Sequence, residues 1–200
     1  MTTQILRVDA SLFGAEGVSS QLNKTLVTLL SEHFKDVSVS ARDFGLQPLP
    51  HFSAEYVAAL ATAPEKRNLA QQHSVALADE LIAEVQQADV LVVAAPMYNF
   101  GVPSGLKAWM DYIARAGVTF RYTENGPQGL LHNKTVYLVT TRGGVHKEQS
   151  SDAQIPYLQN YFAFLGVDDV RVIYAEGINM GQKEESIQQA IQAMQQAIAA

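Results

Sequence analysis

Three short segments combine glycines, hydroxyls, aromatic rings and a histidine in patterns suited to holding an anionic, planar molecule. The first is DASLFGAEGVSSQLNK, from Asp9 to Lys24. Ser11, Ser19 and Ser20 would place hydroxyls at the start of a helix, where free N–H groups and the positive dipole end favour an anion. Neither a P-loop nor a G-x-G-x-x-G fingerprint is present. The segment predicts a phosphate site without a cation, although Ser19 or Ser20 could equally serve only as a helix cap.

The second segment is AAPMYNFGVPS, from Ala94 to Ser104. A plain connection uses small polar residues. This one instead presents two aromatic rings, a thioether and an amide directly after an apolar run, at Met97, Tyr98, Asn99 and Phe100. The segment predicts a surface for a flat ring; the alternative is a loop that folds its aromatic side chains back into the core.

The third segment is TTRGGVHK, from Thr140 to Lys147. A Gly-Gly pair at the end of a strand frees backbone N–H groups to face a ligand. His146 is a candidate proton or hydrogen-bond donor, and a structural or solvated role is equally open to it. Arg142 is suited either to the ligand or to a salt bridge.

Together the three segments offer a phosphate seat, a surface for a ring, and donors for the polar edge of that ring. This combination fits flavin mononucleotide (FMN), with the phosphate in the first segment and the isoalloxazine between the other two. It fits a nicotinamide dinucleotide poorly as a resident cofactor.

Strands and helices that alternate along the chain would position these segments. The apolar patterns predict strands over 5–10, 36–42, 90–95, 135–141 and 170–174, and helices over 20–34, 54–60, 67–87, 103–114, 153–165 and 184–199. This order predicts an α/β fold, a doubly wound five-stranded parallel sheet with helices on both faces, in one domain over 1–200. The strand over 36–42 alternates and fits a half-exposed edge. Ligands of such sheets bind beyond the carboxyl ends of the strands.

Composition narrows the class of protein. The net charge of −6 argues against a nucleic-acid partner. The absence of cysteine excludes disulfides, thiolate catalysis and iron–sulfur clusters, and it removes the commonest zinc ligand, so no metal is expected. We expect no signal peptide and no membrane-spanning segment, which favours a cytoplasmic enzyme or binding domain.

Four motifs carry a resemblance that extends over essentially the whole chain: AAPMYNF at 94–100, ARAGVTFRYTENGPQGL at 114–130, TTRGG at 140–144 and YAEG at 174–177. The sequence resembles the FMN-dependent NADH azoreductases, also called NADH:quinone oxidoreductases, of the flavodoxin-like fold. The second motif is the most specific, because few proteins follow a helix end with GVTFRYTENG.

The resemblance implies a set of FMN contacts. The phosphate and ribityl chain would meet the first segment, the ring the second, and the pyrimidine edge the third, through Ser11, Gly17, Val18, Ser19, Met97, Tyr98, Asn99, Phe100, Thr141, Arg142, Gly143 and Gly144. Family members often carry a hydroxyl residue where Gly17 stands here. The change would remove one hydrogen bond to phosphate, on the order of 1 kcal/mol, and leave the backbone N–H.

The resemblance also implies a homodimer with the active site at the subunit interface. The turn signal Asn125-Gly126-Pro127 predicts a hairpin or excursion over 119–130, above the third segment. The resemblance implies that this segment reaches the neighbouring subunit. Phe120 and Tyr122 are then candidate walls of the substrate pocket, and the helix bearing Tyr161 and Phe162 a further one. Packing within the hairpin itself is the alternative for each residue.

The implied activity is the reduction of quinones and azo compounds by NADH or NADPH, in a two-electron ping-pong cycle in which His146 assists the flavin. The positions of Arg121, Arg142 and Lys147 leave the choice between NADH and NADPH open. Two alternatives are a flavodoxin-type electron carrier that does not react directly with NAD(P)H, and a binding module that has lost its flavin.

Overall fold

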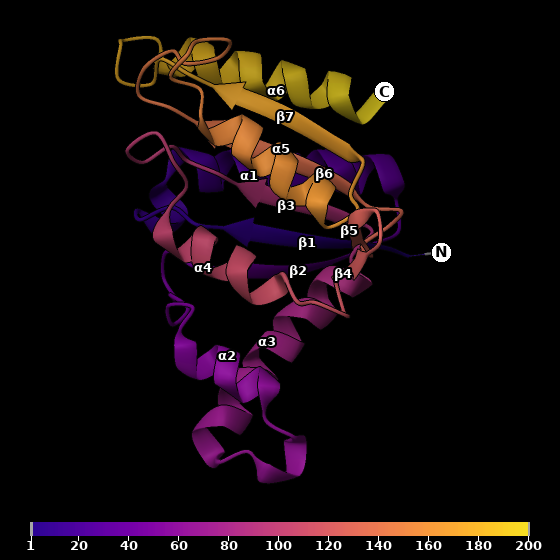
Figure 1. Cartoon of the computed structure of the whole chain (residues 1–200). Helices are drawn as coiled ribbons and strands as arrows, with labels where there is room; N and C mark the ends of the chain where they lie inside the picture. The colour runs from indigo at the N-terminus through magenta and orange to yellow at the C-terminus, as the bar shows by residue number, and fades with distance from the viewer. Residues whose placement is uncertain (1, 200) are drawn as a thin grey trace.

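Five parallel strands form the central sheet of the computed structural model, which describes residues 2–199 (Figure 1). The order across the sheet is β2-β1-β3-β6-β7. The strands are β1 (Thr3–Asp9), β2 (Val37–Asp43), β3 (Val90–Ala94), β6 (Thr135–Thr141) and β7 (Asp169–Ala175). This arrangement confirms the predicted flavodoxin-like α/β fold, and β2 lies at an edge as its alternating pattern indicated. Central β3 is buried along its whole length, which explains its uninterrupted apolar run.

Helices cover both faces of the sheet. On one face lie α1 (Val18–Phe34) and α6 (Lys183–Ala199), which pack with β-strand residues such as Val92 in one apolar cluster. On the other face lie α3 (Leu69–Gln87), α4 (Ser104–Ile113) and α5 (Gln154–Phe164), centred on fully buried Trp109. A short helix, α2 (Ala54–Ala61), packs against α3. Within 2–199, no helix is both long and apolar enough to cross a bilayer.

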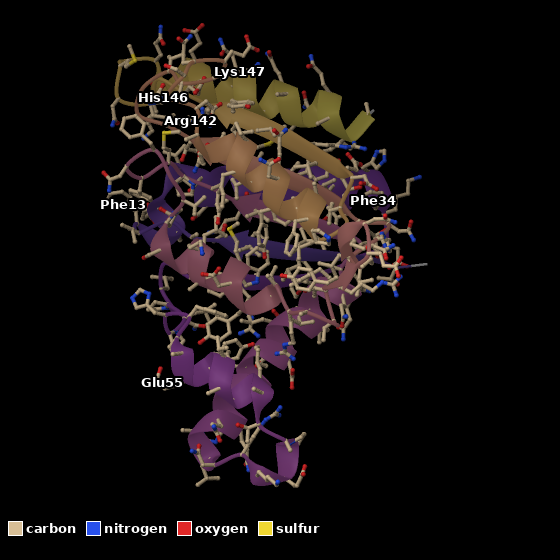
Figure 2. The ribbon with its side chains drawn as sticks, in the orientation of Figure 1. Phe13, Phe34, Glu55, Arg142, His146 and Lys147 are labelled. Atoms are coloured by element: carbon tan, nitrogen blue, oxygen red, sulfur yellow. The ribbon has the colours of Figure 1, made fainter. Side chains whose placement is uncertain are left out.

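The loops that follow β1, β3 and β6 meet at one edge of the sheet, because all five strands point the same way (Figure 1). Figure 2 shows Phe13 of the first loop and Arg142 and His146 of the third toward this edge, with Phe34 at the opposite end of the molecule. The sheet therefore brings together segments more than a hundred residues apart in sequence.

The predicted hairpin is present, but its predicted position above the third loop is wrong. Strands β4 (Phe120–Thr123) and β5 (Gly126–Gly129) pair antiparallel. The Leu131 N–H donates to the Leu165 carbonyl at the end of α5, 2.9 Å away. A Cβ on Gly129 would lie 2.0 Å from the Gly166 nitrogen, so the two backbones are in close contact. The hairpin is thus fixed at the amino edge of the sheet, opposite the third loop (Figure 1).

A buried ion cluster joins the end of β6 to the segments that follow it and β7. The Arg142 side chain has no exposed surface. Its guanidinium pairs with Asp152 at 2.7 Å and with Glu176 at 3.0 Å, and its Nε donates to the Thr140 hydroxyl at 3.2 Å. Two carboxylates and a hydroxyl thus accept from the buried cation, which is the arrangement that makes such a charge tolerable.

We expect Arg142→Met to lower the free energy of unfolding by about 3–5 kcal/mol, because it leaves two largely buried carboxylates without their counter-charge. Lys107→Met is the matched control, since the Lys107–Asp111 pair is partly exposed and should contribute less than about 1 kcal/mol. Urea unfolding of both variants measures the difference. Equal losses in the two variants would mean that the Arg142 cluster does not stabilise the fold.

Candidate functional site

A cavity of about 170 Å³ opens where the loops after β1, β3 and β6 meet. It is lined by residues of all three predicted segments and of a fourth one: Ser11, Phe13, Gly17, Val18, Ser19, Pro96, Met97, Tyr98, Thr141, Arg142, Gly143, Ile178 and Asn179. The structure thus brings together every residue expected around the cofactor except Asn99, Phe100 and Gly144, which lie beside the cavity and not on its wall.

The first wall of the cavity is the start of α1. The helix has no side-chain cap, and its first hydrogen bond runs from Gln21 N–H to the Gly17 carbonyl. The N–H groups of Val18, Ser19 and Ser20 precede that bond and have no partner within the helix. The buried Ser20 hydroxyl has no hydrogen-bond partner in residues 2–199. The helix start therefore offers several unpaired donors, the arrangement that an anion requires.

Glycine at position 17 has a steric cause. A Cβ placed there would lie 2.0 Å from the Ser11 hydroxyl oxygen and 2.6 Å from its Cβ. The Ser11 hydroxyl occupies this space and accepts a hydrogen bond from the Phe13 N–H at 3.2 Å. In this chain a side chain at position 17 and the present place of Ser11 exclude each other.

The second wall is a tight turn from Tyr98 to Gly101. The two residues exchange backbone hydrogen bonds of 3.1 and 2.9 Å. Asn99 and Phe100 between them have φ angles of +50° and +64°, as in a type I′ turn. This left-handed conformation is unfavourable for a bulky residue such as phenylalanine. Phe100 is 58% accessible in this turn, so its ring does not fold back into the core.

The third wall is the backbone of Gly143, held by the segment after β7. Ile178 N–H donates to the Arg142 carbonyl and Asn179 N–H to the Gly143 carbonyl, both at 3.1 Å. A Cβ on Gly143 would lie 2.7 Å from the Asn179 side-chain nitrogen, so a side chain there would have to displace the Asn179 amide. In residues 2–199 the N–H groups of Gly143 and Gly144 donate to no protein acceptor. These two amides are free to bind a ligand.

The side chain of Arg142 belongs to the buried ion cluster, which leaves only its main chain to line the cavity. Of the two roles that the sequence allowed, the salt bridge is the one present. Glu176 extends the cluster, because its Oε1 also accepts from the N–H groups of His146 and Lys147 at 2.8 and 3.0 Å. The charge of Arg142 therefore shapes the third loop and is neutralised there.

His146 lies beside the cavity, next to the second loop. Its Nδ1 is 2.9 Å from the Ser151 hydroxyl. Its ring packs edge-on against Phe100, with centroids 5.8 Å apart. Its Nε2 lies 3.1 Å from the place where a Cβ on Gly144 would stand. The imidazole is thus held between the second and third walls, with Nε2 toward Gly144.

A larger cavity, of about 700 Å³, shares Tyr98 with the smaller one and includes both Asn99 and Phe100. Its wall continues over Leu12 and over Tyr157 of α5. The residues are mostly apolar, with Lys107 as the cation of the wall. Such a surface suits a flat, apolar molecule.

The expectation that Phe162 lines a substrate pocket is wrong. Its ring is only 1% exposed and belongs to the core on the α5 face. Tyr161 also packs on that core, and its hydroxyl donates to the Met110 carbonyl at 2.5 Å. Neither residue lines the two cavities around Tyr98.

Phe120 and Tyr122 lie on the hairpin, at the opposite end of the sheet from the cavity of the same chain. Phe120 packs on Phe164, with ring centroids 4.4 Å apart, and is nearly buried. Tyr122 packs edge-on against Phe120 and is 76% exposed. Within one chain these residues fulfil the alternative expectation, packing of the hairpin, and Tyr122 alone presents a free face.

Sequence reasoning missed Phe13, Pro96, Ile178 and Asn179 on the cavity wall. Ile178 and Asn179 follow β7, the fifth strand of the sheet in chain order, whereas the three predicted segments follow the first, third and fourth strands. The motif YAEG was the available signal, since its last residue, Gly177, has a φ of +70° and turns the chain toward the third loop.

Beneath the first loop, Asp9 is 2% exposed and carries a perturbed carboxyl. Burial raises its pKa, and the nearby Arg7 guanidinium and a hydrogen bond from the Asn23 amide oppose the rise. Asn23 also donates to the carbonyls of Val8 and Val92, at 3.0 and 3.3 Å. The Asn23 amide therefore joins α1 to two strands under the cavity, and the Asp9 carboxyl, one of its acceptors, does not line the cavity.

Comparison with known proteins agrees with this fold and with the expected flavin cofactor. A family model described as "Flavodoxin-like fold" matches residues 3–198. An "FMN-dependent NADH:quinone oxidoreductase" of Cellvibrio japonicus is 47% identical, over 98% of this chain and 98% of the relative. A protein of the same name from Leptothrix cholodnii is 48% identical, over 96% and 94%.

Solved structures of azoreductases superpose on this chain over essentially its whole length. The crystal structure of an azoreductase from Bacillus anthracis str. Sterne superposes with a TM-score of 0.88 at 27% identity, covering all of both chains. An FMN-dependent NADH-azoreductase from Bacillus anthracis str. Ames Ancestor, solved in complex with FMN, superposes with a TM-score of 0.89 over 100% and 98% of the chains; at 22% identity it supports the fold. From the length of these matches and the identity to its relatives, the chain belongs to the flavodoxin-like family of FMN-dependent NADH:quinone oxidoreductases.

Proposed function

We propose that this protein binds FMN in the cavity between the three loops and uses NADH to reduce quinones and azo compounds by two electrons. The observation that carries the proposal is the convergence, on one cavity, of the uncapped start of α1 with the free amide of Gly143, next to which lies the free amide of Gly144. The names of the relatives at 47–48% identity support the same activity.

The phosphate of FMN fits the start of α1. The amides of Val18, Ser19 and Ser20 have no helical acceptor, and the Ser19 hydroxyl lines the cavity. The dipole of a helix of 17 residues adds a favourable field at this end. Backbone amides and hydroxyls can therefore hold the dianion without the lysine of a P-loop.

The ring of FMN fits between the second and third walls. When bound, it would accept the hydride of NADH and then pass two electrons and protons to the acceptor. The amides of Gly143 and Gly144 would stabilise negative charge on the pyrimidine edge, since they need not reorganise to donate. Because His146 lies beside Gly144, it is suited to holding a proton there.

The acceptor would lie against Tyr98 and Phe100, over the larger cavity. These apolar, flat side chains select for planar rings and offer few hydrogen bonds by which to discriminate among them. NADH is the proposed donor, because the relatives at 47–48% identity are named for it. Of the three cations that could recognise the 2′-phosphate of NADPH, Arg142 is already neutralised by two carboxylates.

We further propose that the protein works as a homodimer in the cytoplasm, where NADH is available. The exposed ring of Tyr122 supports the first part, since the hairpin that carries it projects from the end of the sheet opposite its own cavity. In the dimer, Tyr122 would contribute to the pocket of the other subunit.

The activity is tested by anaerobic titration of the FMN-loaded protein with NADH, followed by flavin absorption. We expect rapid bleaching with one NADH per flavin, reversed by one benzoquinone. A protein that keeps its colour with NADH, but exchanges electrons with a reduced dye, would be a carrier of the flavodoxin type. A protein that remains colourless after incubation with FMN would be a binding module.

The phosphate seat is tested with the double variant Ser19→Ala plus Ser20→Ala. Loss of two hydroxyl donors to a dianion should weaken FMN binding by about 10- to 100-fold. Riboflavin, which lacks the phosphate, is the control ligand, and its affinity should not change. Fluorescence quenching measures both dissociation constants. Unchanged FMN affinity would place the phosphate elsewhere.

The role of His146 is tested with His146→Ala. Loss of one hydrogen-bonding group near the pyrimidine edge should lower kcat for quinone reduction roughly five- to tenfold. The FMN dissociation constant should stay within about twofold, because the imidazole does not line the cavity. His73→Ala, on the exposed side of α3, is the matched control and should leave both constants unchanged. Unchanged kcat in His146→Ala would assign His146 a purely structural role.

A further inference from the structure

One buried amide side chain joins the second wall of the cavity to the third. Gln154 is the first residue of α5 and is 1% exposed. Its Nε2 lies 3.0 Å from the Ala95 carbonyl oxygen, 3.2 Å from that of Pro96 and 3.1 Å from that of Gly101. Its Oε1 accepts from the Thr140 hydroxyl at 2.9 Å. Every polar atom of the side chain is therefore occupied.

The hydrogen-bond chemistry of its neighbours fixes which way the amide points. Arg142 Nε can only donate, so the Thr140 hydroxyl accepts from it and turns its own proton toward Gln154. Gln154 must then present its oxygen to Thr140 and its NH₂ group to the three carbonyls. The ion cluster around Arg142 thus sets the orientation of Gln154.

Two of these carbonyls precede the strained turn and one ends it. Asn99 and Phe100 keep their positive φ angles only if the surrounding structure holds both ends of the turn. Gly101 supplies the inner hydrogen bonds to Tyr98. Gln154 supplies the outer ones, at Ala95, Pro96 and Gly101, and so fixes the turn relative to the end of β3.

The same side chain couples this turn to the third loop. Bonds run from the turn through Gln154 and Thr140 to Arg142, and from Arg142 through Glu176 to the amides of His146 and Lys147. The two walls between which a ring would lie are thereby joined by one continuous chain of hydrogen bonds.

We propose that Gln154 is a positioning residue for the flavin ring: it sets the distance between the Met97–Phe100 wall and the Gly143–Gly144 wall. The inference rests on the proposed function. It predicts that Gln154 controls the affinity for the ring and leaves the phosphate seat at the start of α1 unchanged, since none of its hydrogen bonds reaches α1.

The test compares FMN with riboflavin in Gln154→Met and Gln154→Glu. Methionine keeps the length of the side chain and removes all its hydrogen bonds; glutamate keeps an acceptor for Thr140 and loses the NH₂ group. Each variant should raise the dissociation constants for FMN and for riboflavin by the same factor, about tenfold or more. At saturating FMN, the visible circular dichroism of the bound flavin should also change. A thermal melt of each apoprotein shows whether the variant folds. If one variant does not fold, the comparison is made with the other.

Lys134→Met is the matched control. The Lys134 ammonium likewise donates to two backbone carbonyls, of Gln86 and Ala88 at 2.8 and 2.5 Å, but it precedes β6 at the opposite edge of the sheet. Its loss should lower the melting temperature and leave both flavin affinities and the dichroism unchanged.

The outcomes separate the inference from the proposed function. Wild-type protein that binds neither flavin would overturn the function itself. Wild-type protein that binds FMN, with folded Gln154 variants of unchanged affinity and dichroism, would overturn the inference alone. Weaker FMN binding with unchanged riboflavin affinity would also overturn it, because the phosphate seat would then be the part disturbed.

Discussion

The buried charge of Arg142 is the constraint on which the site depends. A guanidinium with no exposed surface needs carboxylates and acceptors around it, because desolvation of an unpaired cation would cost several kcal/mol. Asp152, Glu176 and Thr140 come from three different segments, so satisfying the charge fixes those segments relative to one another. Glu176 then orders the backbone at His146 and Lys147, and Thr140 orients Gln154. Both ring walls are thus linked by hydrogen bonds to the groups that neutralise one cation.

This neutralisation also determines which chemistry the cavity can do. Because Asp152 and Glu176 neutralise the charge of Arg142, the positive field in the cavity comes from dipoles. These are the dipole at the start of α1 and the backbone amides of Gly143 and Gly144. Dipoles of this kind favour an anion or developing negative charge at two fixed places and leave the surface between them apolar. FMN matches this distribution of positive potential better than a small polar metabolite would. Its phosphate carries a permanent negative charge, and its ring gains negative charge only when it is reduced.

The fold, and the meeting of the three predicted segments at one cavity, were predictable from the sequence, because both depend on local patterns. The apolar run of β3, the periodicity of the helices and the direction of parallel strands bring Ser19, Tyr98 and Gly143 to one edge. The position of the hairpin was not predictable, since it depends on a close contact between Gly129 and Gly166, which are 37 residues apart. The burial of Phe162 and the partners of Arg142 likewise depend on tertiary contacts. The type of a residue does not indicate which distant residues will surround it.

The turn at Asn99 and Phe100 illustrates why local reading fails where function is most demanding. Asparagine tolerates a positive φ, but phenylalanine does not favour it, and a glycine there would be the locally consistent choice. The chain instead keeps an exposed ring in a strained conformation and holds the turn through a buried amide far along the sequence. A glycine would relieve the strain and remove the surface against which a planar acceptor can lie. The conflict between backbone preference and side chain is therefore resolved in favour of the ring, and the hydrogen bonds of Gln154 link the turn to the network that begins at Arg142.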